Sequence, residues 1–330
     1  MSFFAVLLAL LIEQLKPLPR NNWVHRTLMA WVAWTGRNFD AGHERHAVVV
    51  WCITVLVPAL AAASLHIALA RTSLLAALAF DVGVLYLSLG FRQFSHYFTD
   101  IRDALGRGDE ELARRLLAQW RHLDTSALPR TELLRHVIEH SLLAAHRHVF
   151  GVFFCYVAFS AFGLGPAGAV LYRMAEFAAR YWSFKSRTLE APVNERLMAL
   201  SQRLFAAIDH VPARLTAFGF AVVGNFEEAV NGWRRDAVLW SYSNDGILLA
   251  AAAGALGVQL GGQPAPSPAF DPSRAYAGAH EAEALGASGP TPSGAPPQAG
   301  HLQSVVGLVW RSVVLWLLLA ALLSLANVLG

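Results

Sequence analysis

The stretch that decides the fold is residues 235–262, RDAVLWSYSNDGILLAAAAGALGVQLGG. A polar turn at its centre leads into an apolar run of small residues. The sequence predicts that Asn244 or Asp245 caps a helix and that Gly246 lets the chain bend before that helix starts. Residues 257–261 have the G-x-x-x-G spacing. Such spacing lets a second helix approach backbone to backbone, an arrangement common in membrane proteins.

The composition of the chain indicates a protein solvated largely by lipid. Of its 330 residues, 55% are hydrophobic and 15% are charged, and the mean hydropathy is +0.41. Because apolar segments run from end to end, we predict an all-α fold, a polytopic integral membrane helical bundle with an inserted soluble helical hairpin. The net charge of +3 is small, and basic residues lie beside apolar spans. This pattern favours contact with lipid headgroups over nucleic acid.

We expect five regions along the chain. They are an N-terminal interfacial region with the first two membrane spans (1–90), a soluble helical hairpin (91–148), a membrane-embedded core with the candidate site (149–262), a Pro/Gly/Ala-rich linker (263–301) and a C-terminal span (302–330). The spans follow from apolar runs long enough to cross the hydrocarbon core of a bilayer.

An apolar run within the predicted core, residues 149–172, is interrupted by Gly163-Leu-Gly165-Pro166. Proline breaks helices, so this run either crosses the membrane or enters and returns as two short helices. Basic residues crowd both sides of it, which favours the re-entrant hairpin.

Asp81 lies in the middle of the second predicted span, residues 73–90. A carboxylate is costly inside a membrane, so it marks a functional group or an acid with a buried partner. The sequence leaves both readings open.

Residues 136–140, HVIEH, match the H-x-x-E-H spacing of inverted zinc peptidases. Two histidines four residues apart share a helix face, and the glutamate beside them suits a general base. The chain holds 13 histidines, so chance matches are easy, and no third ligand is evident. A zinc peptidase is therefore a third alternative.

Several motifs resemble those of the CobD/CbiB family. Residues 211–217, VPARLTA, resemble its I-P-A-R-L-T-A element, and residues 254–262, GALGVQLGG, resemble its G-A-L-G-V-R-L-G-G element. Residues 105–117 and 171–173 add further matches, and all of them fall in order over most of the chain. The resemblance implies a multi-spanning protein of cobalamin biosynthesis. Such proteins are associated with ATP-dependent amide formation between adenosylcobyric acid and an aminopropanol, or its phosphate, giving adenosylcobinamide or its phosphate.

The resemblance also implies roles for particular residues. The candidates are Glu139, Asn244 and Asp245 for catalysis, Tyr172, Arg173, Lys185 and Arg214 for substrate binding, and Glu139 and Glu176 for a metal. Magnesium prefers oxygen ligands and phosphate prefers cationic partners. The expected cofactors are Mg²⁺ and ATP, and the expected partners are a corrinoid, an aminopropanol-type molecule and membrane lipids. The expected location is the bacterial inner membrane.

The chain departs from the family pattern mainly at acidic and amide positions. At these positions this chain has Leu143, Ala144, Arg147, Glu176, Ala179, Phe205, Ala206 and Leu249. Loss of acids removes candidate metal ligands and bases. These departures favour an alternative function, that of a non-catalytic membrane sensor or signalling protein similar to AmpE-like proteins.

Overall fold

In the computed structural model, the described residues form helices and short connections, with one isolated β-bridge between Val258 and Ala295. These residues are 2–16, 23–39, 44–121, 125, 128–187, 195–240, 243–261 and 294–329. The predicted all-α class is confirmed for them. Most of the expected linker, together with Tyr242 and Gly262, lies outside this set.

Within the described ranges, four helical segments are long and apolar enough to cross a membrane. They are His46–Thr72, Arg130–Ala161, Glu195–Val223 and Ala299–Ala326. Large apolar side chains on two of them stay exposed, including Leu60 at 64% and Val314 at 62%. Such exposure is unfavourable in water and suits lipid contact. The predicted membrane helical bundle is confirmed.

The chain folds into two compact units, and each combines separate stretches of sequence. Unit 1 comprises residues 1–93, 147–212 and 317–330, and unit 2 comprises residues 94–146 and 213–316. This grouping cuts across the five regions expected from the sequence.

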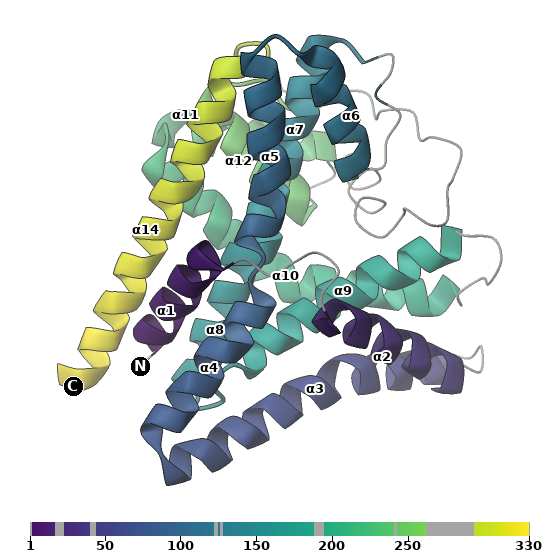
Figure 1. Cartoon of the computed structure of the whole chain (residues 1–330), viewed down its shortest axis with the longest axis vertical. Coiled ribbons are helices and arrows are strands. Elements are labelled where there is room, and N and C mark those ends of the chain that lie inside the picture. The colour runs from purple at the N-terminus through teal and green to yellow at the C-terminus, as the bar shows by residue number, and fades with distance from the viewer. Residues whose placement is uncertain are drawn as a thin grey trace. The chain divides into compact units, whose positions relative to one another are not determined.

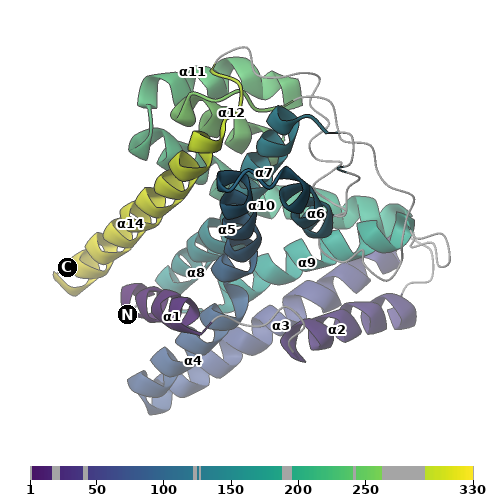
Figure 2. The same ribbon diagram turned by 45° about the horizontal axis from the view of Figure 1, so that its top comes forward.

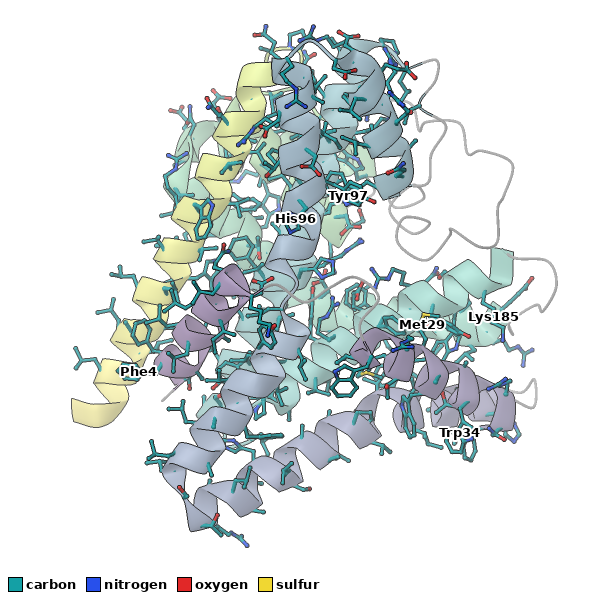
Figure 3. All side chains as sticks on the ribbon, viewed as in Figure 1. Phe4, Met29, Trp34, His96, Tyr97 and Lys185 are labelled. Atoms are coloured by element: carbon teal, nitrogen blue, oxygen red, sulfur yellow. The ribbon has the colours of Figure 1, made fainter. Side chains whose placement is uncertain are left out.

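Unit 1 is built around helix α9. Its helices are α1 (Ser2–Leu15), α2 (Trp23–Phe39), α3 (Glu44–Thr72), α4 (Leu74–Ser88), α8 (Gly151–Ala161), α9 (Ala167–Arg187) and the first part of α10 (Glu195–Val223). Helix α9 packs against α3 and α8, and α1 packs against α4 (Figure 1). Helix α2 exposes Trp23 and Trp34, of which Figure 3 labels Trp34. Aromatic residues of this kind are common at headgroup depth.

Asp81 on α4 has two side-chain partners in unit 1. His66 Nδ1 on α3 lies 2.7 Å from Asp81 Oδ1, and the Tyr156 hydroxyl on α8 donates to Oδ2 at 2.9 Å. The carboxylate is thus satisfied by three packed helices, so the structure supports the buried-partner reading.

Of the two alternatives for residues 149–172, the structure shows two helices separated at the Gly163–Pro166 interruption. Helix α8 ends at Ala161 and α9 begins at Ala167. Gly163 and Gly165 adopt positive φ angles of 72° and 55° in the turn, which favour glycine. The two helices then pack so closely that a Cβ on Gly168 would lie 2.0 Å from the Cys155 carbonyl oxygen. How this hairpin lies in the membrane stays a prediction.

Unit 2 contains the other helices. They are α5 (Phe91–Gly106), α6 (Glu110–Arg121), α7 (Arg130–Ala145), the end of α10, α11 (Phe226–Asp236), α12 (Asn244–Leu256) and most of α14 (Ala299–Leu329). The charged residues Glu111 and Arg115 of α6 are exposed, as expected for a solvated face. Helix α7 differs, because every residue from Leu133 to Ala145 is buried. It also continues through a π-helical turn, His146–Phe150, into α8.

Helix α12 begins and ends differently from the sequence prediction. Ser243 is the N-cap, its Oγ accepting a hydrogen bond from the Gly246 N–H at 3.1 Å, and the helix already starts at Asn244. The predicted Asn244 or Asp245 cap was therefore wrong. Gly257 ends the helix in a left-handed conformation, with φ of 65°. The G-x-x-x-G spacing thus lies beyond the helix.

The predicted close approach to a second helix occurs one turn earlier, at Gly254. A Cβ there would lie 2.1 Å from the Glu228 carbonyl oxygen of α11, and one on Gly232 of α11 would lie 2.7 Å from the Ala250 carbonyl oxygen. Glycine at both positions lets α11 and α12 pack side by side, as Figure 2 shows.

Candidate functional site

Glu139 is fully buried on α7 and is bound from two directions. Arg135, one turn earlier, donates from Nη1 to Glu139 Oε1 at 3.1 Å. The Gly261 N–H donates to the same oxygen at 2.7 Å, joining residues 122 positions apart. Arg135 also donates to Glu132. The carboxylate therefore anchors the segment after α12 to α7.

Arg214 and Asn244 lie together in unit 2. Arg214 on α10 donates from Nη1 to Asn244 Oδ1 at 3.2 Å. Asn244 is the first residue of α12, and Asp245 follows it at 9% exposure. An acid in the first turn suits the positive end of the helix dipole. The sequence predicted both Arg214 and Asn244 as site residues, and the fold brings them into contact.

Glu139 and Asn244 make their contacts at opposite ends of α12. Asn244 opens the helix, whereas Gly261 follows its C-cap. A helix of 13 residues is about 20 Å long. The structure thus shows Arg214 beside Asn244, and it shows Glu139 at the other end of this helix.

Arg173, Glu176 and Arg180 form a charged cluster on α9 in unit 1. Arg173 Nη1 donates to Glu176 Oε2 at 3.1 Å, and Arg180 Nη1 lies 3.4 Å from Glu176 Oε1. The three residues follow helical spacing, so they share one face. Burial alone would raise the pKa of the Glu176 carboxyl, but Arg180 and Arg173, with His148 and Arg147, lower it to about 2. Glu176 is therefore ionised at neutral pH.

Tyr172 is completely buried in unit 1. Its hydroxyl donates to Asp209 Oδ1 on α10 at 2.7 Å, and Phe205 packs edge-on against its ring. A Cβ on Gly151 would lie 2.2 Å from the ring, so Gly151 makes room for it. The structure gives Tyr172 a role in holding Asp209, and its predicted contact with substrate stays a prediction.

Lys185 lies apart from the Arg173 cluster. Figure 3 labels it near the C-terminal end of α9, where its side chain is half-buried. Twelve helical residues separate Lys185 from Arg173, a rise of about 18 Å. The two cations therefore cannot bind the same small anion directly.

The two acids predicted to hold a metal do not fit that role. Glu139 is bound by Arg135 and Gly261, and Glu176 is held between two arginines. A magnesium ion needs several oxygen ligands around one point. Within the described ranges, no three His, Cys, Asp or Glu side chains gather as a metal site would require. His140 of the H-x-x-E-H sequence also makes a contact within the protein. It packs edge-on against Trp120, with 4.2 Å between ring centroids.

Comparison with known protein families decides the membership of the chain. The model of the family described as "CobD/Cbib protein" matches residues 3–281. The chain belongs to the CobD/CbiB family. The resemblance drawn from its motifs is thereby confirmed, and it extends to the first helices.

Curated relatives agree with this assignment. The chain is 33% identical to the cobalamin biosynthesis protein CobD of Stutzerimonas stutzeri over 278 residues, which is 84% of this chain and 82% of the relative. It is 35% identical to CobD of Chromobacterium violaceum over 198 residues, 59% of each chain. CobD of Leptospira interrogans is 27% identical over 187 residues, 55% of this chain and 56% of the relative. No solved structure matches the chain.

Several positions where the chain departs from the CobD/CbiB pattern lie near the α9 cluster of unit 1. Arg147 acts electrostatically on both Glu176 and Tyr172, and Phe205 packs on Tyr172. Ala179 is buried on α9 between Glu176 and Arg180. At these three positions, acids of the family pattern are therefore replaced by one basic and two apolar residues.

Sequence reasoning missed three residues that complete these contacts. They are Arg135, Arg180 and the backbone N–H of Gly261. The two arginines stand four residues from Glu139 and Glu176, a spacing that itself predicts ion pairs on a helix. No sequence signal predicts the Gly261 contact, because it depends on tertiary packing.

Proposed function

We propose that this chain acts in cobalamin biosynthesis as an adenosylcobinamide(-phosphate) synthase, joining the carboxyl group of adenosylcobyric acid to an aminopropanol or its phosphate. Membership of the CobD/CbiB family supports the pathway. The hydrogen bond between Arg214 and Asn244 supports a site for this reaction at the start of α12. Two family elements 30 residues apart place a cation and an amide together at the start of α12.

The geometry at this site suits the binding of an anionic substrate group. Asn244 accepts a hydrogen bond from Arg214 Nη1 and so fixes its guanidinium, a group that binds carboxylate and phosphate oxygens well. The first turn of α12 adds the partial positive charge of a helix N-terminus. In the proposed reaction, ATP would transfer a phosphoryl group to the corrinoid carboxyl oxygen and leave as ADP. The amine nitrogen would then attack the carbonyl carbon, expel that phosphate and lose a proton. Asp245, at the same turn, is the proposed acceptor of that proton.

ATP and Mg²⁺ enter this proposal through the family resemblance. Because Glu139 and Glu176 are held by arginines, we assign neither of them to a metal. We also propose a bacterial inner-membrane location, supported by the four apolar helices and by the bacterial sources of the relatives.

Purified full-length protein with ATP, Mg²⁺, adenosylcobyric acid and each amine tests the proposal, with the product detected by mass spectrometry. We expect adenosylcobinamide or its phosphate to form. Asn244→Ala and Arg214→Gln should lower kcat/KM about tenfold or more, since each removes a charge-assisted contact. Arg115→Gln, on the exposed face of α6, is the matched control and should match the wild type.

A second candidate function follows from the same acids. The loss of family acids and the arginine pairing of Glu139 and Glu176 favour a non-catalytic, AmpE-like sensor or signalling protein. If well-folded protein forms no product with either amine, the ligase proposal fails. Corrinoid binding in that sample would then support the sensor.

A further inference from the structure

The charged cluster on α9 lies at the border between the interior of unit 1 and solvent. Glu176 is 3% exposed, whereas the side chains of Arg173 and Arg180 are 19% and 21% exposed. The carboxylate thus forms the base of the cluster, and the two guanidinium groups form its accessible side. A ligand arriving from solvent would meet the arginines first.

Arg173 has more N–H donors than it uses within the described residues. A guanidinium carries five N–H donors. In the part of the chain that the structure describes, Arg173 forms one side-chain hydrogen bond, from Nη1 to Glu176. Its other donors are set on a largely buried side chain, where lost hydration is costly unless an acceptor replaces it.

Two further basic side chains act on this cluster. Arg147 and His148, in the π-helical turn, lower the pKa of the Glu176 carboxyl together with Arg180 and Arg173. Positive charge gathered in this way around one carboxylate attracts anions.

The Arg173 side of the cluster also has the geometry that oxyanions prefer. Glu176 accepts a hydrogen bond from Arg173 Nη1 and forms an ion pair with Arg180 Nη1, so it constrains the direction of both guanidinium groups. Planar guanidinium groups bind phosphate oxygens through paired N–H bonds. π-helical turns such as His146–Phe150 occur frequently at functional sites.

We infer that Arg173 and Arg180, positioned by Glu176, bind a phosphate group. This inference replaces the metal site expected at Glu176 with a site for an anion, and it adds Arg180, which the sequence did not single out. It does not depend on amide formation by the chain. The phosphate could belong to a soluble phosphate ester or to a lipid headgroup, since both present the same oxygens.

Two binding experiments on the full-length protein distinguish these sources. The first is calorimetric titration of detergent-solubilised protein with inorganic phosphate and with a soluble phosphate monoester at pH 7 and low salt. The second is mass spectrometry of lipids retained by protein from nanodiscs of phosphatidylcholine with or without phosphatidylglycerol. Each is repeated with Arg173→Gln, Arg180→Gln and the control Arg115→Gln.

We expect Arg173→Gln and Arg180→Gln each to weaken phosphate binding, or retention of phosphatidylglycerol, about tenfold or more, with no effect of Arg115→Gln. Titration with the soluble ligands identifies a free phosphate group, and selective retention of phosphatidylglycerol identifies a headgroup; either result supports the site. Arg173→Lys keeps the charge without the planar fork and should bind more weakly than wild type. It serves as the test if Arg173→Gln does not fold.

The inference is overturned if wild type binds neither ligand, or if the α9 variants bind as tightly as wild type and Arg115→Gln. Its failure is distinct from failure of the ligase proposal. Normal phosphate binding without product formation would count against the ligase alone. Product formation without phosphate binding at this cluster would count against the site alone.

Discussion

At Glu176, burial and neighbouring charge act on the pKa in opposite directions. Burial disfavours the carboxylate, but the guanidinium groups of Arg180 and Arg173 outweigh it and lower the pKa to about 2. A carboxyl whose pKa is lower in the folded than in the unfolded chain stabilises the fold above its unfolded value. That stabilisation is lost as the pH falls from about 4.5 toward 2.

We expect Glu176→Gln to remove this pH dependence. At pH 7 the variant should be less stable than wild type by up to roughly 3 kcal/mol, and the difference should shrink as the pH approaches 2. Thermal unfolding in detergent between pH 7 and pH 3 measures both effects. Glu111→Gln, on the exposed face of α6, is the control. Parallel pH curves for wild type and Glu176→Gln would contradict the prediction.

Asp81 and Asp209 show a second way of burying an acid. Each accepts a hydrogen bond from a tyrosine on another helix, Tyr156 and Tyr172 respectively. The sequence marked Asp81 as unusual for a membrane helix, because a carboxylate there needs a partner. It gave no means of choosing the tyrosines, which lie 75 and 37 residues away.

At the level of elements, glycine determines how closely helices pack. The α11 and α12 backbones meet at Gly254, where an added Cβ would lie 2.1 Å from the Glu228 carbonyl oxygen. Backbone atoms cannot rotate away as a side chain can. The two helices would therefore have to separate.

We predict that Gly254→Ala destabilises unit 2 by about 1–3 kcal/mol through this overpacking. Gly83→Ala in α4 is the matched control, because its Cβ would have nothing within 4 Å. There the higher helix propensity of alanine should be neutral or favourable by up to about 1 kcal/mol. Denaturation midpoints measured in the same detergent compare the two. Equal effects of both substitutions would show that the close contact is unimportant.

At the scale of the whole molecule, unit 1 relates two turns that lie far apart in sequence. His66 stands six residues before the end of α3, and it packs against Gly165 in the α8–α9 turn. Six helical residues span about 9 Å. The turn between α3 and α4 and the turn between α8 and α9 therefore lie at the same end of unit 1.

We expect both turns to open on the same side of the membrane. Arg71→Cys and Phe162→Cys, each in a chain with Cys52 and Cys155 replaced by alanine, report on them, since both positions are exposed. A membrane-impermeant maleimide should label both in one vesicle orientation and neither in the other until detergent is added. Labelling from opposite sides would contradict this arrangement.

The sequence by itself determined what depends on local pattern and composition. Hydropathy identified membrane helices, because lipid requires long apolar segments with satisfied backbones. Gly163 to Pro166 predicted the break between α8 and α9, and the motifs around Arg214 and Gly254 placed the chain in its family. Helix ends were less certain, since Ser243, Asn244 and Asp245 are all good caps and one hydrogen bond decides among them.

The tertiary structure alone decided which charged groups are paired. In the sequence, Glu139 and Glu176 resemble metal ligands, because the residue type does not show whether a carboxylate is paired with an arginine. The fold added Gly261 to Glu139 and set Arg147 near Glu176, and these contacts join residues from separate stretches. Electrostatic energy depends on distance in space and on burial, and neither is a property of sequence position.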